Sequence, residues 1–137
     1  MRAIRLLFLT GVLAVAVAAV ALAVTPATGQ FVGGGAKVQV LPGAKTMYVY
    51  LGVDYQKVFT SAGPKAAVKI SQGRFSYNGS ILILVYKPKV HTVPAHGTFS
   101  GRFITPKKLT LSYKVTKGNF KASKDRITLK LWSSSQS

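Results

Sequence analysis

Glycine and phenylalanine alternate along residues 97–103, Gly-Thr-Phe-Ser-Gly-Arg-Phe, with a period of two. In an extended chain this period places the glycines and phenylalanines on one face and Thr98, Ser100 and Arg102 on the other. The pattern predicts a strand with one buried face, on which glycines leave room for the rings of neighbouring strands. The same Gly-x-Phe triplet recurs at residues 73–75 and 118–120. The sequence therefore indicates that the same Gly-x-Phe triplet is used in several strands.

Most of the remaining chain alternates in the same way, and no window after residue 30 has the 3.6-residue period of a helix. The clearest examples are residues 46–53, 107–116 and 125–132. About eight short strands at regular spacing predict an all-β domain over residues 37–132, an antiparallel β-sandwich with a small barrel as the alternative. Tyr48 and Tyr50 alternate with apolar residues. We expect them to pack on the second face, and an exposed binding platform is the alternative.

One glycine-containing pair predicts a turn, and another predicts a break in a strand. Asn78-Gly79 is a preferred pair for a two-residue hairpin, so residues 74–77 and 80–87 are expected to be neighbouring strands. The apolar positions Val68 and Ile70 are even-numbered, whereas Phe75 is odd-numbered. A break or bulge at Gln72-Gly73 would return them to a common face. Residues 90–96, which contain Pro94, are expected to form a loop.

The first 29 residues predict a signal peptide, or a membrane anchor if they are not cleaved. Arg2 and Arg5 precede an uncharged run rich in Leu, Val and Ala over residues 6–24, and Pro26 and small residues follow. The run approaches the roughly 20 residues of a membrane-spanning helix, which is why an anchor remains the alternative. Residues 30–36, with three consecutive glycines, predict a flexible linker, and residues 133–137 a disordered tail. The domain is expected to be extracellular or in the cell envelope.

Charge is the feature that bears most directly on function. Nineteen Lys and Arg residues face two Asp residues and no Glu, which gives a net charge of +17. A hydrophobic content of 48% excludes an intrinsically disordered polycation. Nine basic residues follow residue 101 and form the predicted anion-binding face: Arg102, Lys107, Lys108, Lys114, Lys117, Lys121, Lys124, Arg126 and Lys130. The alternative is that this charge only keeps an exported β protein soluble and its sheet edges unpaired.

Residues suited to catalysis or metal binding are scarce. Asp54 and Asp125 are the only carboxylate side chains, and their sequence contexts do not bring them together as a catalytic pair. His91 and His96 have no third ligand nearby for a metal ion. The chain has no cysteine, and therefore no disulfide, thiolate metal site or cysteine nucleophile. We predict a protein that is not an enzyme and uses no cofactor or metal.

The predicted partner is an anionic polymer or cell-envelope surface, such as an acidic polysaccharide, an envelope polymer or lipid headgroups. Sequence-specific nucleic-acid recognition is disfavoured, because it needs exposed aromatics for stacking and most aromatics here alternate inward. Membrane attachment is expected only if the leader stays uncleaved. A second hypothesis, of another class, is a structural or assembly module that pairs with a partner protein through its sheet edges.

Three features together resemble a loose group of uncharacterised secreted bacterial all-β proteins. They are the Gly-x-Phe strands, the export leader and a closing strand, residues 126–132, that ends in Trp132. The similarity covers residues 65–132. Members of that group often carry a cysteine pair before the last strand, which this chain lacks. The resemblance implies an all-β fold and export, and it implies no particular activity.

Overall fold

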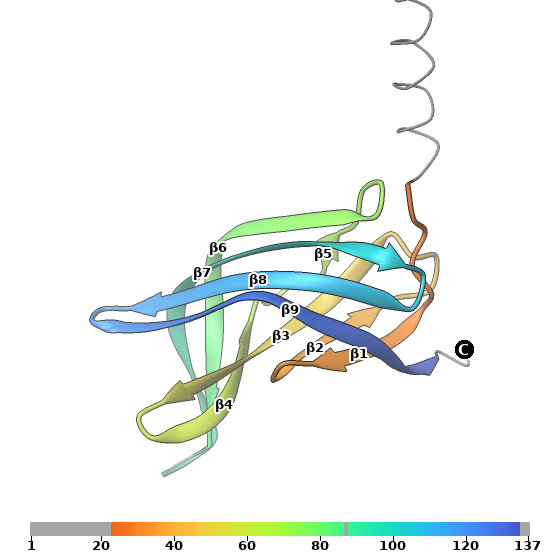
Figure 1. Cartoon of the computed structure of the whole chain (residues 1–137). Helices are drawn as coiled ribbons and strands as arrows, with labels where there is room; N and C mark the ends of the chain where they lie inside the picture. Colours follow the sequence, from red (N-terminus) through yellow and green to blue (C-terminus); the bar gives the residue numbers. More distant parts are fainter. Residues whose placement is uncertain (1–22, 87, 135–137) are drawn as a thin grey trace, which may run out of the picture.

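A computed structural model describes residues 23–86 and 88–134, and within them nine strands form one antiparallel sheet (Figure 1). The prediction of an all-β antiparallel fold is therefore confirmed. The strands are β1 (Gly29–Gly33), β2 (Ala36–Val40), β3 (Thr46–Tyr55), β4 (Val58–Gly63), β5 (Val68–Lys69), β6 (Arg74–Val85), β7 (His91–Thr105), β8 (Lys108–Lys117) and β9 (Phe120–Ser134).

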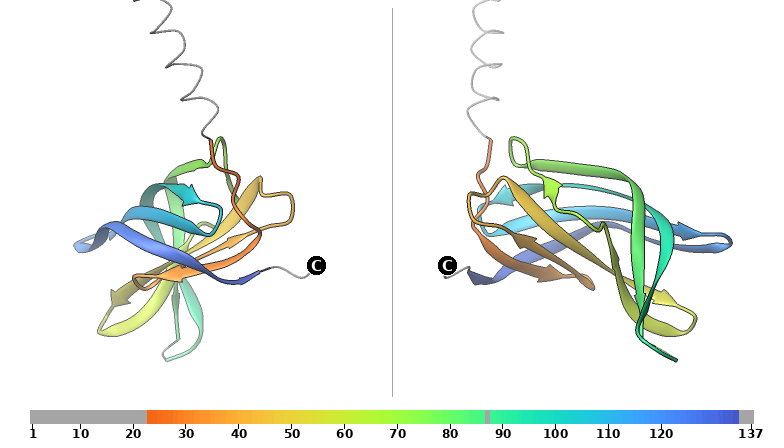
Figure 2. Two further views of the ribbon diagram at one scale, coloured as in Figure 1. Left: turned by 45° about the vertical axis from the view of Figure 1, so that its right-hand side comes forward. Right: turned by 180° about the vertical axis from the view of Figure 1, so that it is seen from behind.

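The strand pairings return to their starting point. The order is β2-β1-β9-β8-β7-β6-β4-β3, with β5 beside β3, and β2 also pairs with β3. The pairing of β6 with β7 spans twelve residue pairs, from Arg74–Arg102 to Val85–His91. Figures 1 and 2 show that these two strands run side by side and bend together, which curves the sheet around its core.

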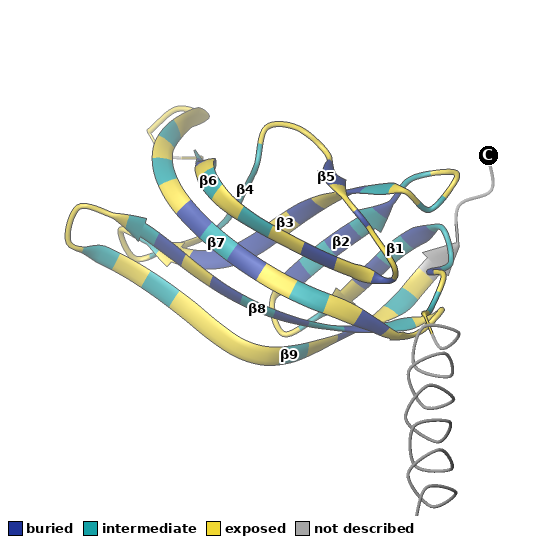
Figure 3. Cartoon of the chain, turned by 90° about the horizontal axis from the view of Figure 1, so that it is seen from above, coloured by how far each residue is buried: buried dark blue, intermediate teal, exposed yellow. Residues whose placement is uncertain are grey.

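The core lies on the inner face of the curved sheet and is built by alternation. In β7, Gly97, Phe99 and Phe103 are buried and Ser100 and Arg102 are exposed, as the period of two predicts (Figure 3). In β8, all four predicted inward residues are buried: Leu109, Leu111, Tyr113 and Val115. The rings of Phe75, Phe99, Phe103 and Phe31 then pack against one another, with Phe31 and Phe103 edge to face at 5.4 Å.

The predicted hairpin at Asn78-Gly79 is wrong, because β6 runs straight through this pair. Asn78 lies opposite Thr98 and Gly79 opposite Gly97 of β7. The reversal occurs instead at Gln72-Gly73, where both residues have positive φ (53° and 71°) and the backbones of Ser71 and Arg74 exchange two hydrogen bonds. The predicted break at this point is confirmed. It places Val68, Ile70 and Phe75 together in the core.

The Gly-x-Phe triplets serve two different purposes. Gly73 and Gly118 are turn residues with positive φ, whereas Gly97 and Gly101 lie within β7. Residues 90–96 were expected as a loop, but β7 begins at His91. Pro94 is accommodated because residues 91–95 pair with β6 alone, so the missing N–H faces an unpaired edge.

The linker prediction for residues 30–36 is also wrong. Residues 29–33 form β1, which pairs with both β2 and β9, and Gly34 and Gly35 form the turn into β2. Strand β9 extends to Ser134, so the predicted tail begins within a strand. Of the predicted signal or anchor segment, residues 1–22 lie outside the described part, as do residues 135–137. Within residues 23–86 and 88–134 there is no helix of the length and hydrophobicity needed to cross a membrane.

Candidate functional site: a basic outer face

The outer face of β6, β7, β8 and β9 carries hydroxyl and basic side chains in rows that cross the strands. One row places Arg74 beside Arg102, followed by Thr110 and Thr128. The next row begins with Ser76, Ser100 and Ser112. These rows follow from the inner alternation, because a strand that buries its odd-numbered residues must present the even-numbered ones outward.

Arg74 and Arg102 form the most unusual pair in these rows, because two like charges lie directly opposite each other. Such a pair places the Cβ atoms about 5 Å apart and destabilises a sheet unless a counter-charge is present. A second like-charged pair, Lys108 and Lys130, joins β8 to β9 one row further along. Four positive charges thus gather at the end of the outer face that carries the β7–β8 turn.

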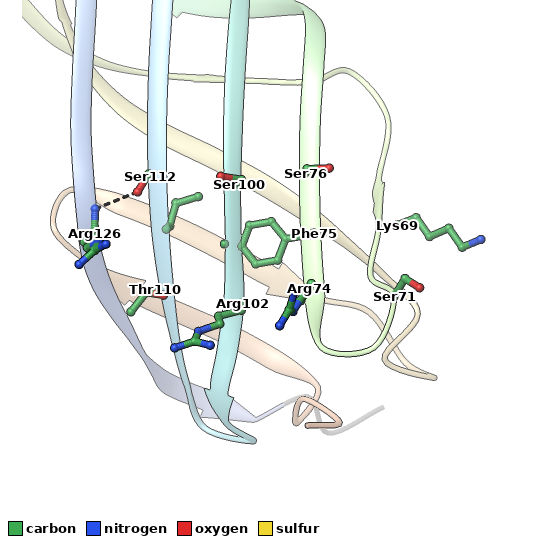
Figure 4. A pocket seen from close by; sticks show the side chains of 12 residues that line it. Lys69, Ser71, Arg74, Phe75, Ser76, Ser100, Arg102, Thr110, Ser112 and Arg126 are labelled. Carbon is green, nitrogen blue, oxygen red and sulfur yellow. Dashed lines mark hydrogen bonds between the residues drawn. The ribbon is translucent and has the colours of Figure 1, made fainter. Parts of the chain in front are cut away.

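The face is hollowed here into a depression of about 750 Å³, which we name the arginine basin (Figure 4). The basin draws its basic side chains from four strands, and Phe75, Gly101 and Leu111 contribute to its floor. Its other lining residues are Lys69, Ser71, Arg74, Ser76, Ser100, Arg102, Thr110, Ser112 and Arg126. Figure 4 shows the side chain of Lys69 extending away from the three arginines. Guanidinium groups beside hydroxyl groups are suited to oxyanions, because both donate hydrogen bonds.

A bulge in β9 gives Arg126 its place in the basin. Opposite Ser112 the register shifts, and Arg126 adopts a positive φ of 53°. The Ser112 hydroxyl donates to Asp125 at 2.7 Å and accepts the backbone N–H of Arg126 at 2.9 Å. The side-chain hydrogen bonds of the described residues include none from the guanidinium groups of Arg74, Arg102 or Arg126. Their donors remain available to a ligand.

The nine predicted basic residues divide into two groups. Arg102 and Arg126 line the basin, Lys108 and Lys130 flank it, and Lys107 lies in the adjoining turn. The other four lie toward the β8–β9 turn: Lys114, Lys117, Lys121 and Lys124. Of these, Lys124 is turned away from the outer face, because its Nζ donates to the carbonyl oxygen of Gly34 at 2.7 Å.

Arg74 is the functional candidate that sequence reasoning missed. The predicted hairpin at Asn78-Gly79 paired residues 74–77 with residues 80–87, which placed Arg74 away from Arg102. The signal was available in the unbroken alternation of residues 74–78, since Arg74, Ser76 and Asn78 share a parity with Thr98, Ser100 and Arg102.

The residues considered for catalysis lie on three different strands, and of these only Asp125 adjoins the basin, through its hydrogen bond with Ser112. Asp54 is exposed on β3 and Asp125 is exposed on β9. His91 and His96 are exposed on β7, and the Nδ1 atom of His91 lies 2.7 Å from the carbonyl oxygen of Lys89. In the part of the chain that the structure describes, no three His, Asp or Glu side chains come together in a way that could hold a metal ion.

Comparison with known proteins leaves the basin as the main guide to function. No protein-family model, curated protein or solved structure matches the chain.

Proposed function

We propose that the protein is an exported, non-enzymatic β domain that binds an anionic polymer or an anionic envelope surface through its basic outer face. The observation that carries the proposal is the pairing of Arg74 with Arg102 in a hollow lined by hydroxyl groups. Two opposed guanidinium groups cost stability in the free protein, and an anion between them relieves that cost. Charge that served solubility alone would have no reason to gather in this way.

Export and architecture belong to the same proposal. The uncharged run after Arg2 and Arg5 supports a leader that carries the domain out of the cytoplasm. For the architecture, we favour a small closed barrel over the predicted sandwich, because β2 pairs with β3 as well as with β1. A closed circuit supports a rigid outer face, on which the spacing of the arginines is fixed.

Binding to sodium polyphosphate, a polyanion without sugar or base, tests the basin directly. The double variant Arg74→Gln/Arg102→Gln should weaken association by about tenfold or more, because two charge-assisted contacts are lost. The control Lys57→Gln/Lys65→Gln removes the same charge from exposed residues that do not line the basin. Equal weakening by the two double variants would show that net charge alone attracts the polymer, and would overturn the proposal.

A second candidate, an assembly module, is favoured by one observation. Strand β9 pairs with β1 only from Lys130 onward, so its earlier residues have an unpaired edge on that side. The lysines and the bulge along this edge oppose pairing with another chain, which is why we rank the candidate second. It predicts a complex in native cell extracts that survives high salt. A strict monomer there would exclude it.

A further inference from the structure

The outer face of β2, β3 and β4 carries a second hollow, of about 430 Å³, which is distinct from the arginine basin. We name it the aromatic shelf. It is lined by Gly35, Ala36, Lys37, Tyr50, Gly52, Phe59, Thr60 and Ser61. Tyr50 is 38% exposed and Phe59 is 66% exposed. Second-face packing was expected for Tyr48 and Tyr50, and the structure instead exposes both.

Phe59 owes its position to the glycines beneath it. A Cβ atom on Gly52 would lie 2.6 Å from the ring Cζ of Phe59 and would collide with the carbonyl oxygen of Gly35. The same ring atom lies 3.8 Å from where a Cβ of Gly35 would be. The tip of the ring therefore lies over bare backbone, and two thirds of the residue remains exposed to water.

Positive charge lies beside these rings. The Nζ atom of Lys37 lies 5.0 Å from the centroid of the Tyr50 ring, a cation–π distance. Lys124 reaches the same region from β9, where its Nζ would lie 3.2 Å from a Cβ of Gly35. The lining contains the hydroxyl group of Ser61 and no carboxylate, whereas the hydroxyl of Thr60 is buried. The shelf thus combines exposed aromatic rings, ammonium groups and a hydroxyl group.

We propose that the aromatic shelf binds a sugar ring of an acidic polysaccharide. The C–H groups of a sugar carry partial positive charge and pack on the electron-rich face of Phe59, while Lys37 attracts the acid group. A nucleobase can also stack on an exposed ring, but the shelf has no Asn, Gln, Arg, Asp or Glu side chain to read its edge by paired hydrogen bonds. This inference rests on the proposed function, and it selects acidic polysaccharide among the anionic partners.

Three probes separate the possibilities: alginate oligosaccharide, sodium polyphosphate and oligothymidine. The variant Phe59→Leu keeps an apolar side chain over Gly52 but removes the flat ring. It should weaken alginate binding by about fivefold to tenfold and leave polyphosphate binding unchanged. The control Tyr86→Leu alters an exposed aromatic residue away from the shelf and should change neither. A urea titration of each variant verifies that it is folded.

Unchanged alginate binding by Phe59→Leu would overturn the inference, and so would an equal or larger loss of oligothymidine binding. Lys37→Gln provides a second route, since it should weaken alginate binding without touching the ring. The proposal for the arginine basin is tested separately. It fails if Arg74→Gln/Arg102→Gln leaves polyphosphate binding unchanged. The two proposals can therefore fail independently.

Discussion

Two glycines in this sheet meet phenylalanine rings in nearly the same way, one inside the molecule and one outside. A Cβ atom on Gly101 would lie 2.6 Å from the Cζ of Phe75 and would collide with the carbonyl oxygen of Thr110. The distance from Gly52 to Phe59 is the same, and there the collision is with Gly35. Phe75 is 4% exposed and packs against Phe99 and Phe103, whereas Phe59 is 66% exposed.

The two contacts differ in how much each ring contributes to folding. The inner ring is removed from water on all sides, so its burial contributes to folding. The outer ring gains little from covering Gly52, and any aliphatic side chain could do the same. Because this ring adds little to folding and lies beside Tyr50 and Lys37, we assign it to ligand binding.

Removal of the two rings should give the largest difference. Phe75→Ala is expected to lower the free energy of unfolding by about 3–5 kcal/mol, because it leaves a cavity in the core. Phe59→Ala should cost less than about 1 kcal/mol, since most of the side chain is already hydrated. Urea denaturation measures both. Similar losses of unfolding free energy in the two variants would show that Phe59 stabilises the fold as Phe75 does, and would contradict the assignment of Phe59 to the shelf.

Addition of a methyl group to each glycine should give an intermediate effect. Gly101→Ala is expected to cost about 1–3 kcal/mol, because Phe75 is held between Phe99 and Phe103 and cannot move aside. Gly52→Ala should cost less, since the ring of Phe59 can turn into solvent and only the clash with Gly35 remains. Thermal unfolding of the two variants compares them. The opposite order would mean that the outer contact is the more rigid one.

Tyr113→Phe should have a small effect on stability. The Tyr113 hydroxyl donates to the carbonyl oxygen of Gly52 at 2.7 Å and so anchors the floor of the shelf from inside. Loss of this bond is expected to cost about 1 kcal/mol. Burial raises the pKa of Tyr113 above its usual value near 10, so the unfolded state loses this proton first as pH rises.

Stability due to Tyr113 should therefore be complete below about pH 10 and decline above it. Tyr113→Phe should lessen that alkaline decline. Urea titrations at neutral and alkaline pH measure the difference between the two proteins. A decline of equal size in the variant would assign the alkaline loss to other groups.

Local alternation predicted which face of each strand is buried, because successive side chains of a strand point to opposite faces of the sheet. The inward sets of β7 and β8 follow directly from it. Turn residues were less reliable. Asn78-Gly79 has the composition of a hairpin turn, but its neighbours on both sides pair with β7, and that long ladder outweighs local preference. Residues 30–36 likewise form no linker but most of β1 and a turn at Gly34-Gly35, because β1 pairs with both β2 and β9.

The site was predicted in part. Basic residues after residue 101 were identified from charge alone, and Arg102 and Arg126 do line the basin. The pairing of Arg74 with Arg102 depends on strand register, which no local pattern gives. The shelf depends on the meeting of Gly35, Gly52 and Phe59 from one turn and two strands, and such a contact is visible only in three dimensions.

The central claim is that Arg74 and Arg102 contact an anion directly. The most direct test is the salt dependence of polyphosphate binding, measured for the native protein and for Arg74→Gln/Arg102→Gln. The logarithm of the association constant should fall linearly with the logarithm of salt concentration. In the double variant this fall should be shallower, with the magnitude of the slope smaller by about two. Identical slopes for the two proteins would contradict the claim.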